Sequence, residues 1–97
     1  MISAFDQCFS LTTVTIPDSV THICEEAFRS CNSLESIELP ASLVYIGPSA
    51  FNGCSSLRNI SFAGTVNQWN RIDKRANWNA YIPATEVICT DGTVSLN

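Results

Sequence analysis

The sequence has few residues of the kinds that carry out catalysis. His22 is the single histidine, and no serine or cysteine stands at a recurring spacing from it, so a nucleophile–base pair is not indicated. Two carboxylate pairs, Glu25 with Glu26 and Glu35 with Glu38, are of the type that glycoside hydrolases use. Neither pair recurs when the chain repeats its pattern, and the surface that would carry them should be open. We therefore expect solvated side chains, no cofactor site and no enzyme.

The five cysteines are the other reactive groups, and none belongs to a C-x-x-C pair that would bind zinc or exchange disulfides. Cys8, Cys31 and Cys54 follow one another at a constant interval, whereas Cys24 and Cys89 stand outside that series. Regular spacing favours a place in a packed core, because unpaired cysteine behaves as a small hydrophobe. We expect buried thiols and no metal site; disulfides are the alternative.

Composition limits the class of protein. A chain of 97 residues makes at most one domain. With 45% hydrophobic and 14% charged residues, it is too apolar for disorder and too interrupted by polar residues for a membrane span. Its net charge of −4 argues against nucleic acid as a partner. The small basic cluster of Arg71, Lys74 and Arg75 is expected to be a solvated face. No signal peptide is evident, so the protein is cytoplasmic or its export signal lies outside this sequence.

One pattern occurs three times, at a constant interval, in the first two thirds of the chain. An Ala-Phe pair opens each copy, with the phenylalanines at Phe5, Phe28 and Phe51, and a cysteine follows three residues later. A Ser-Leu pair and alternating apolar residues come next, followed by Pro17 or Pro40 in the first two copies. A period of about 23 residues is the signature of a solenoid, in which each period forms one coil and equivalent residues stack.

Each coil should contain a short strand that pairs in parallel with the next coil. Val14 and Ile16 would point to the core, and Thr13 and Thr15 to solvent. The proline that follows ends the strand, because it has no N–H to donate. A second short strand is expected near Val20–Ile23, and a tight helical turn around 27–31. The three phenylalanines should form a ladder in the core rather than an aromatic binding stripe.

The repeat can be written C-x-x-L-x-x-I-x-[IL]-P-x-x-[VL]-x-x-I-x-x-x-A-F, and it resembles the BspA-like leucine-rich repeats. The resemblance covers residues 4 to about 69, with departures at Cys24, where Gly47 has the usual glycine, and at Ala63, in place of proline. It implies a leucine-rich-repeat solenoid, a β-rich right-handed superhelix of short parallel strands and short helical turns. It also implies a surface or secreted protein of bacteria or of some parasitic protists.

The last third of the chain is similar to the segment that often ends such arrays. We divide the domain into repeats at 1–66, about three coils with the first incomplete, and a C-terminal capping segment at 67–97. Thr65 and Gln68 fit a capping box, which predicts a helix at about 66–75. Trp69 keeps the phase of Ile23 and Ile46, and Trp78 should cover the end of the core.

A hairpin should complete this capping segment. Alternating residues around Asp91-Gly92 predict a turn between strands at Val87–Cys89 and Val94–Leu96.

The N-terminal end of the array has no such cap, because Met1 enters the first coil midway, at the Ala-Phe position. Two explanations are open. Either the chain is a piece of a longer array, or two chains self-associate through their open ends.

The outward strand positions form two columns, which are the candidate interaction surface. Their residues are Thr13, Ser36 and Asn59 in one column and Thr15, Glu38 and Ser61 in the other. These side chains are short and polar, and they lack the aromatic anchors of tight interfaces. Two functions fit. One is a non-catalytic protein-interaction module of a cell-surface or secreted bacterial protein, binding host or matrix proteins in adhesion, without membrane insertion. The other is a structural spacer or cap with no ligand of its own.

Overall fold

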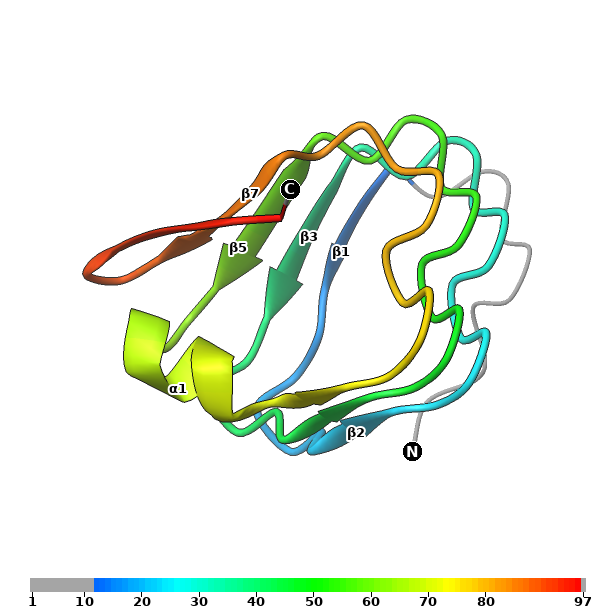
Figure 1. Ribbon diagram of the computed structural model, residues 1–97. Helices are drawn as coiled ribbons and strands as arrows, with labels where there is room; N and C mark the ends of the chain where they lie inside the picture. Colours follow the sequence, from blue (N-terminus) through cyan, green and yellow to red (C-terminus); the bar gives the residue numbers. More distant parts are fainter. Residues whose placement is uncertain (1–11, 97) are drawn as a thin grey trace.

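The chain winds into a solenoid with two sheets, in which all the strands pair in parallel except β8, as a computed structural model that describes residues 12–96 shows (Figure 1). One sheet has the strand order β1-β3-β5-β7-β8 and the other the order β2-β4-β6. A single helix, α1, lies between β5 and β6 in the sequence of the described residues. The bounds are β1 Thr13–Thr15, β2 His22–Ile23, β3 Ser36–Leu39, β4 Tyr45–Ile46, β5 Asn59–Phe62, α1 Val66–Arg71, β6 Asp73–Lys74, β7 Glu86–Cys89 and β8 Gly92–Ser95.

The strand register follows the sequence period. Val14 pairs with Ile37, and Ile37 with Ile60, its equivalents in the successive copies of the repeat, in parallel ladders. Ile23 pairs with Ile46 at the same spacing in the other sheet. The predicted solenoid of stacked coils is therefore confirmed. The second strand is shorter than the expected Val20–Ile23, because the amide of Val20 instead closes a turn onto the carbonyl of Pro17, 3.1 Å away.

The core is built from residues at equivalent positions of successive coils. The rings of Phe28 and Phe51 are fully buried and stacked, with centroids 5.1 Å apart. Phe5, the third member of the predicted ladder, lies outside the described residues, as does Cys8. Cys31 and Cys54 are buried thiols, as their spacing predicted. No disulfide joins any cysteine within residues 12–96.

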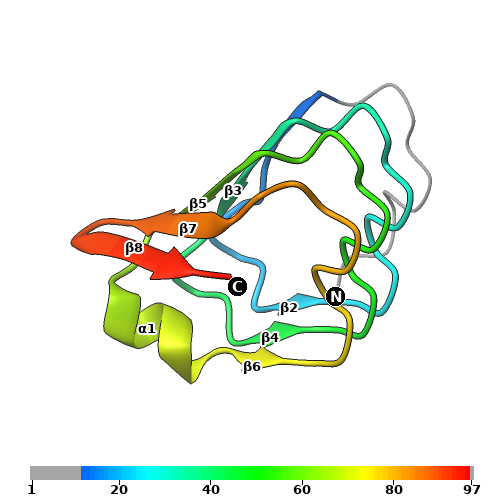
Figure 2. The same ribbon diagram turned by 45° about the horizontal axis from the view of Figure 1, so that its top comes forward.

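Tight turns form the third side of the solenoid, where the sequence predicted helical turns around 27–31. In each of the three turns within residues 12–96, two residues adopt positive φ at equivalent positions: Glu26, Ser49 and Asn77 at one position, and Ser30, Gly53 and Tyr81 at the other. Backbone bonds join these turns between coils, as from the amide of Phe28 to the carbonyl of Ala50 at 2.8 Å. The turns stack side by side in Figures 1 and 2.

The helix is shorter than predicted. It ends at Arg71 rather than near residue 75, because Ile72 is extended and the chain then joins the second sheet as β6. The amide of Asp73 donates to the carbonyl of Val44, and that of Arg75 to Ile46, both at 3.0 Å. Sheet pairing thus overrides the helical spacing of the sequence. The predicted capping box is confirmed: the side chain of Thr65 accepts from the amide of Gln68.

The segment after α1 continues the winding with a longer coil. Ile46 pairs with Lys74, a longer step along the chain than the repeat spacing, so Trp69 does not occupy the position of Ile46 as its phase suggested. Trp69 lies instead on the inner side of α1, almost completely buried. Trp78 covers the end of the core as predicted, with its ring edge-on to Phe51 and also against Trp69.

A hairpin closes the five-stranded sheet. β7 pairs in parallel with β5, and β8 pairs antiparallel with β7. The hairpin is confirmed, but its two loop residues are Thr90 and Asp91, because Gly92 already pairs with Cys89, and β8 ends at Ser95. Asp91 accepts a hydrogen bond from the first amide of α1, that of Val66, at 2.9 Å. The hairpin is therefore fixed to the start of the helix (Figure 2).

Candidate binding face

The outer face of the five-stranded sheet carries both columns predicted from the sequence. We call the six side chains of these columns the sheet face: Thr13, Ser36, Asn59, Thr15, Glu38 and Ser61. The register places them side by side on β1, β3 and β5. Inward residues such as Ile37 and Ile60 are almost completely buried, whereas the sheet face is exposed or half-exposed. The core therefore does not depend on the identity of these outward side chains.

Hydrogen bonds between neighbouring strands order this face. The hydroxyl of Thr15 donates to Oε2 of Glu38 at 3.1 Å, and Nδ2 of Asn59 donates to the hydroxyl of Ser36 at 3.4 Å. In each pair, the two residues hold equivalent positions in successive coils. Stacking of coils thus brings each polar side chain against its equivalent in the next coil.

Sequence reasoning missed one member of this surface, Ile88. Ser61 pairs with Ile88, which in turn pairs with Thr93, so the second column continues onto β7 and β8. Ile88 is 48% exposed and adds an apolar group to an otherwise polar column. The signal was available, since Val87 and Cys89 were predicted to lie in one strand and the residue between them must then face outward.

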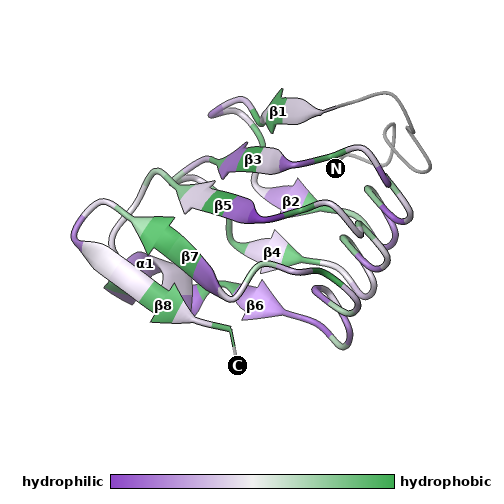
Figure 3. Cartoon of the chain, turned by 90° about the horizontal axis from the view of Figure 1, so that it is seen from above, coloured by the Kyte–Doolittle hydropathy of each residue, from purple (hydrophilic) through white to green (hydrophobic). Residues whose placement is uncertain are grey.

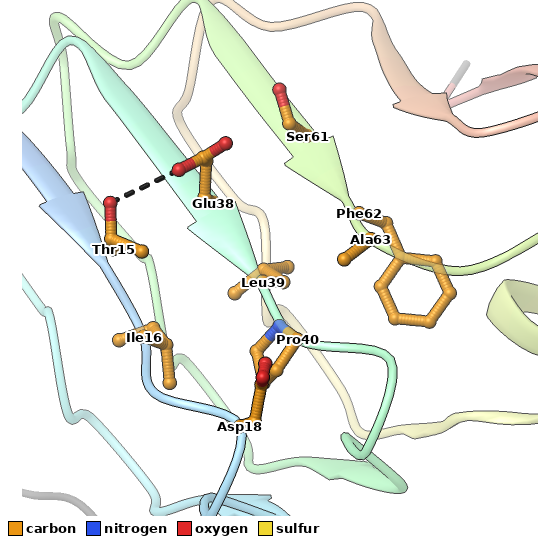
Figure 4. A pocket seen from close by; sticks show the side chains of 9 residues that line it. All are labelled: Thr15, Ile16, Asp18, Glu38, Leu39, Pro40, Ser61, Phe62 and Ala63. Carbon is orange, nitrogen blue, oxygen red and sulfur yellow. Dashed lines mark hydrogen bonds between the residues drawn. The ribbon is translucent and has the colours of Figure 1, made fainter.

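Two hollows mark this side of the sheet. One of about 250 Å³ lies over the middle of the strands and is lined by all six residues of the sheet face. The other, of about 160 Å³, lies where β1, β3 and β5 end (Figure 4). We call the second hollow the strand-end pocket; its lining residues are Thr15, Ile16, Asp18, Glu38, Leu39, Pro40, Ser61, Phe62 and Ala63.

Ala63, which departs from the repeat, lies at the strand-end pocket. Its amide donates to the carbonyl of Leu39 at 2.9 Å, a bond that Pro17 and Pro40 cannot make at the equivalent positions. The departure therefore adds one ladder bond to β5.

The other groups weighed for chemistry are dispersed. His22 is exposed on the second sheet, where its Nδ1 lies 2.8 Å from the hydroxyl of Thr21 and its ring lies near that of Tyr45. Glu26 pairs with Arg29 at 2.9 Å, away from the sheet face. Within the described part of the chain, no three metal-binding side chains gather. Among residues 12–96, no hydrogen bond or ion pair joins His22 to a glutamate.

The basic cluster is a solvated face at Arg71 and Arg75, as predicted, but not at Lys74. Within it, Arg71 alone belongs to α1, and it is exposed. Lys74 is half-buried, and its Nζ donates to the carbonyls of Trp69 and Ile72, both at 3.0 Å, above the ring of Trp69. Burial lowers the pKa of Lys74, while Asp73 opposes that shift. Lys74 is thus a cap for the end of the helix.

Burial also controls the thiols. It raises the pKa of Cys54 from 9.0 to about 12, and its Sγ donates to the carbonyl of Phe28 at 2.9 Å. Burial raises the pKa of Cys89 as well, and the charge of Asp91 adds to that shift. The thiolate is the reactive form of cysteine, so these two groups are structural at neutral pH.

Comparisons with known proteins agree with this architecture. A family model described as BspA type leucine rich repeat region (6 copies) matches residues 2–80. Among solved structures, the chain is similar to a leucine rich cell surface protein from Faecalibacterium prausnitzii, with 43% sequence identity and a TM-score of 0.70. The similarity covers 73% of this chain and 19% of that one, so the chain spans about a fifth of that protein's length. The comparison with curated proteins gave no match.

The parallel ladders and the open sheet face define a leucine-rich-repeat solenoid. Because the family model matches most of the sequence, the chain belongs to the BspA-type leucine-rich repeat family. Repeats of this class are protein-interaction folds. In residues 12–96, no helix has both the length and the apolar character needed to cross a membrane.

Proposed function

We propose that this chain is a non-catalytic module that binds proteins through the sheet face, as part of a bacterial cell-surface or secreted protein engaged in adhesion or host contact. The observation that carries this proposal is the in-register row of exposed side chains that the core does not use. The similarity to a cell surface protein supports the location.

The face predicts weak binding by a single copy. Its six residues are polar and none is aromatic, and Ile88 is its one large exposed apolar neighbour on the described strands. Affinity should increase when several coils or several copies act together, because linked sites raise the effective concentration. Binding partners in this proposal are host or matrix proteins.

A structural spacer or cap is the second candidate. The way α1 and the β7–β8 hairpin close one end of the core favours it, since Trp69 and Trp78 are buried there. Self-association through the N-terminal end concerns residues outside those described, and light scattering at micromolar concentration tests it: a clean monomer would exclude it.

The experiment is a binding panel on a sensor surface with purified matrix and serum proteins. Thr15→Lys with Glu38→Lys should weaken binding, because both changes place long cations on the sheet face. Asn67→Lys with Asn70→Lys, on exposed positions of α1, is the matched control and should bind normally. An unchanged affinity of the variant with Thr15→Lys and Glu38→Lys would contradict the proposal. Failure of the chain to bind any panel member would favour the spacer.

A further inference from the structure

The strands of the five-stranded sheet carry charge of one sign. The five strands β1, β3, β5, β7 and β8 contain two charged residues, Glu38 and Glu86, and both are acidic and exposed. Asp18 adds a third carboxylate at the strand ends. The basic residues Lys74 and Arg75 belong to the other sheet or directly follow it. Arg58 is exposed and directly precedes β5, at the end of the strand opposite the strand-end pocket. A partner that covers this face therefore meets acidic groups on the strands and no cation from them.

The strand-end pocket contains both carboxylates and some hydrocarbon. Glu38 and Asp18 line the same hollow as Leu39, Phe62 and Ala63; Leu39 and Phe62 are almost completely buried, whereas Ala63 is exposed. In Figure 4, Thr15, Glu38 and Ser61 lie toward one side of the pocket, and Asp18 lies beside Pro40 on the other. The pocket thus combines carboxylates with hydrocarbon, which suits a basic side chain that lays its aliphatic stem on apolar surface and its cation beside carboxylates.

The Glu38 carboxylate is oriented but not neutralised. Thr15 donates to one of its oxygens, Oε2. Among residues 12–96, the recorded ion pairs are those of Arg29 with Glu26 and of Arg75 with Asp73, so neither Glu38 nor Asp18 has a cationic partner within the described chain. Both charges are therefore available to a ligand.

We infer that the strand-end pocket receives an arginine or lysine side chain of a protein partner, so that the sheet face selects partners with a basic segment. This inference rests on the proposed function and specifies the chemistry of the partner. The supporting argument is charge complementarity over a formed hollow, which favours a cationic over a neutral or acidic segment.

The test is a titration of the isotopically labelled chain with the acetylated and amidated peptide Gly-Arg-Gly-Arg-Gly at low salt, followed by NMR. We expect the largest amide shifts at residues 15–18, 38–40 and 61–63, and no binding of the peptide with glutamate in place of arginine. Asp18→Asn with Glu38→Gln should weaken binding about fivefold to tenfold. Ser61→Glu, which adds a carboxylate to the pocket, should tighten it about twofold to threefold.

The control must separate the pocket from overall charge. Glu25→Gln with Glu35→Gln also neutralises two exposed carboxylates and changes the net charge from −4 to −2, yet neither residue lines the pocket. This variant should bind as the parent does. Three results would overturn the inference. The two double variants could weaken binding equally, the largest amide shifts could lie outside the strand-end pocket, or the arginine peptide could fail to bind. The proposed function would still stand if matrix-protein binding depended on the sheet face, and it would fail separately if that binding ignored the face.

Discussion

The rings of Phe28 and Phe51 lie parallel within 7°, with centroids 5.1 Å apart, although the two residues are separated by a full repeat in the sequence. This stacking is the direct physical expression of the repeat. It shows that one repeat of the sequence forms one coil and that the next repeat stacks directly against it. The two sheets, the stacked turns and the sheet face all depend on this stacking of coils.

Phe28→Ala should lower the free energy of unfolding by about 3–5 kcal/mol, because it removes a large, fully buried ring and leaves a cavity against Phe51. Urea denaturation followed by tryptophan fluorescence measures the loss. Val44→Ala is the control, since Val44 is 52% exposed, and its effect should stay within about 0.5 kcal/mol. An unchanged midpoint for Phe28→Ala would contradict the core assignment.

Gly47→Ala should cost about 1–3 kcal/mol, because a Cβ there would meet the backbone nitrogen of Glu25 at 2.6 Å and neither coil can move without disturbing the ladder. Gly53 provides a contrast, since its constraint is a φ of +80° and its nearest neighbour would be 3.5 Å away. Gly53→Asn should therefore be mild, because asparagine tolerates that conformation. Thermal melting compares the two variants; similar losses would argue against close packing of the coils at Gly47.

Cys54 should make stability fall at alkaline pH. Folding raises its pKa from 9.0 to about 12, so between these values the unfolded chain loses the thiol proton while the folded chain keeps it. The free energy of unfolding therefore decreases as pH rises, by about 1.4 kcal/mol per pH unit from this group, and its contribution is complete below about pH 9. Denaturation of the parent and of Cys54→Ser from pH 8 to 11 isolates the effect. If the free energy of unfolding fell with pH at the same rate in both proteins, Cys54 would not be the cause of the decrease.

Lys74→Met should destabilise the fold by about 1–3 kcal/mol, because the carbonyls of Trp69 and Ile72 lose their charged donor. The ring of Trp69 also loses the cation above it, so the emission of the folded state should change. Arg71→Met is the matched control on the exposed side of α1 and should be close to neutral. If thermal unfolding gave the same melting temperature for both variants, Lys74 would not be the residue that caps the helix.

The sequence period was sufficient to predict most of the fold. The identical spacing from Ile23 to Ile46 and from Ile37 to Ile60 determines the register of both sheets. The period failed after Phe62, where α1 lengthens the coil. β6 was not predicted, because its Asp73 and Lys74 have little strand propensity and are held mainly by backbone bonds to the neighbouring coil. Figure 3 shows that β6 is hydrophilic, whereas β7 is largely hydrophobic.

The candidate site was predictable to the same degree. Alternation along the strands was enough to assign the outward columns, such as Thr15, Glu38 and Ser61. The strand-end pocket was not predictable, because it depends on how Asp18, Glu38 and Phe62 from three coils meet at the ends of their strands. Such a meeting depends on side-chain packing that no single repeat contains.

Because β8 runs antiparallel to β7, a further coil cannot be added at this end of the array. A further coil would need to lay a parallel strand against the edge of β7, and β8 already occupies that edge. Duplicated repeat units can instead be inserted between existing coils, where each new strand finds a parallel neighbour on both sides. A repeat added in this way would leave the end of the core that Trp78 and the hairpin cover unchanged.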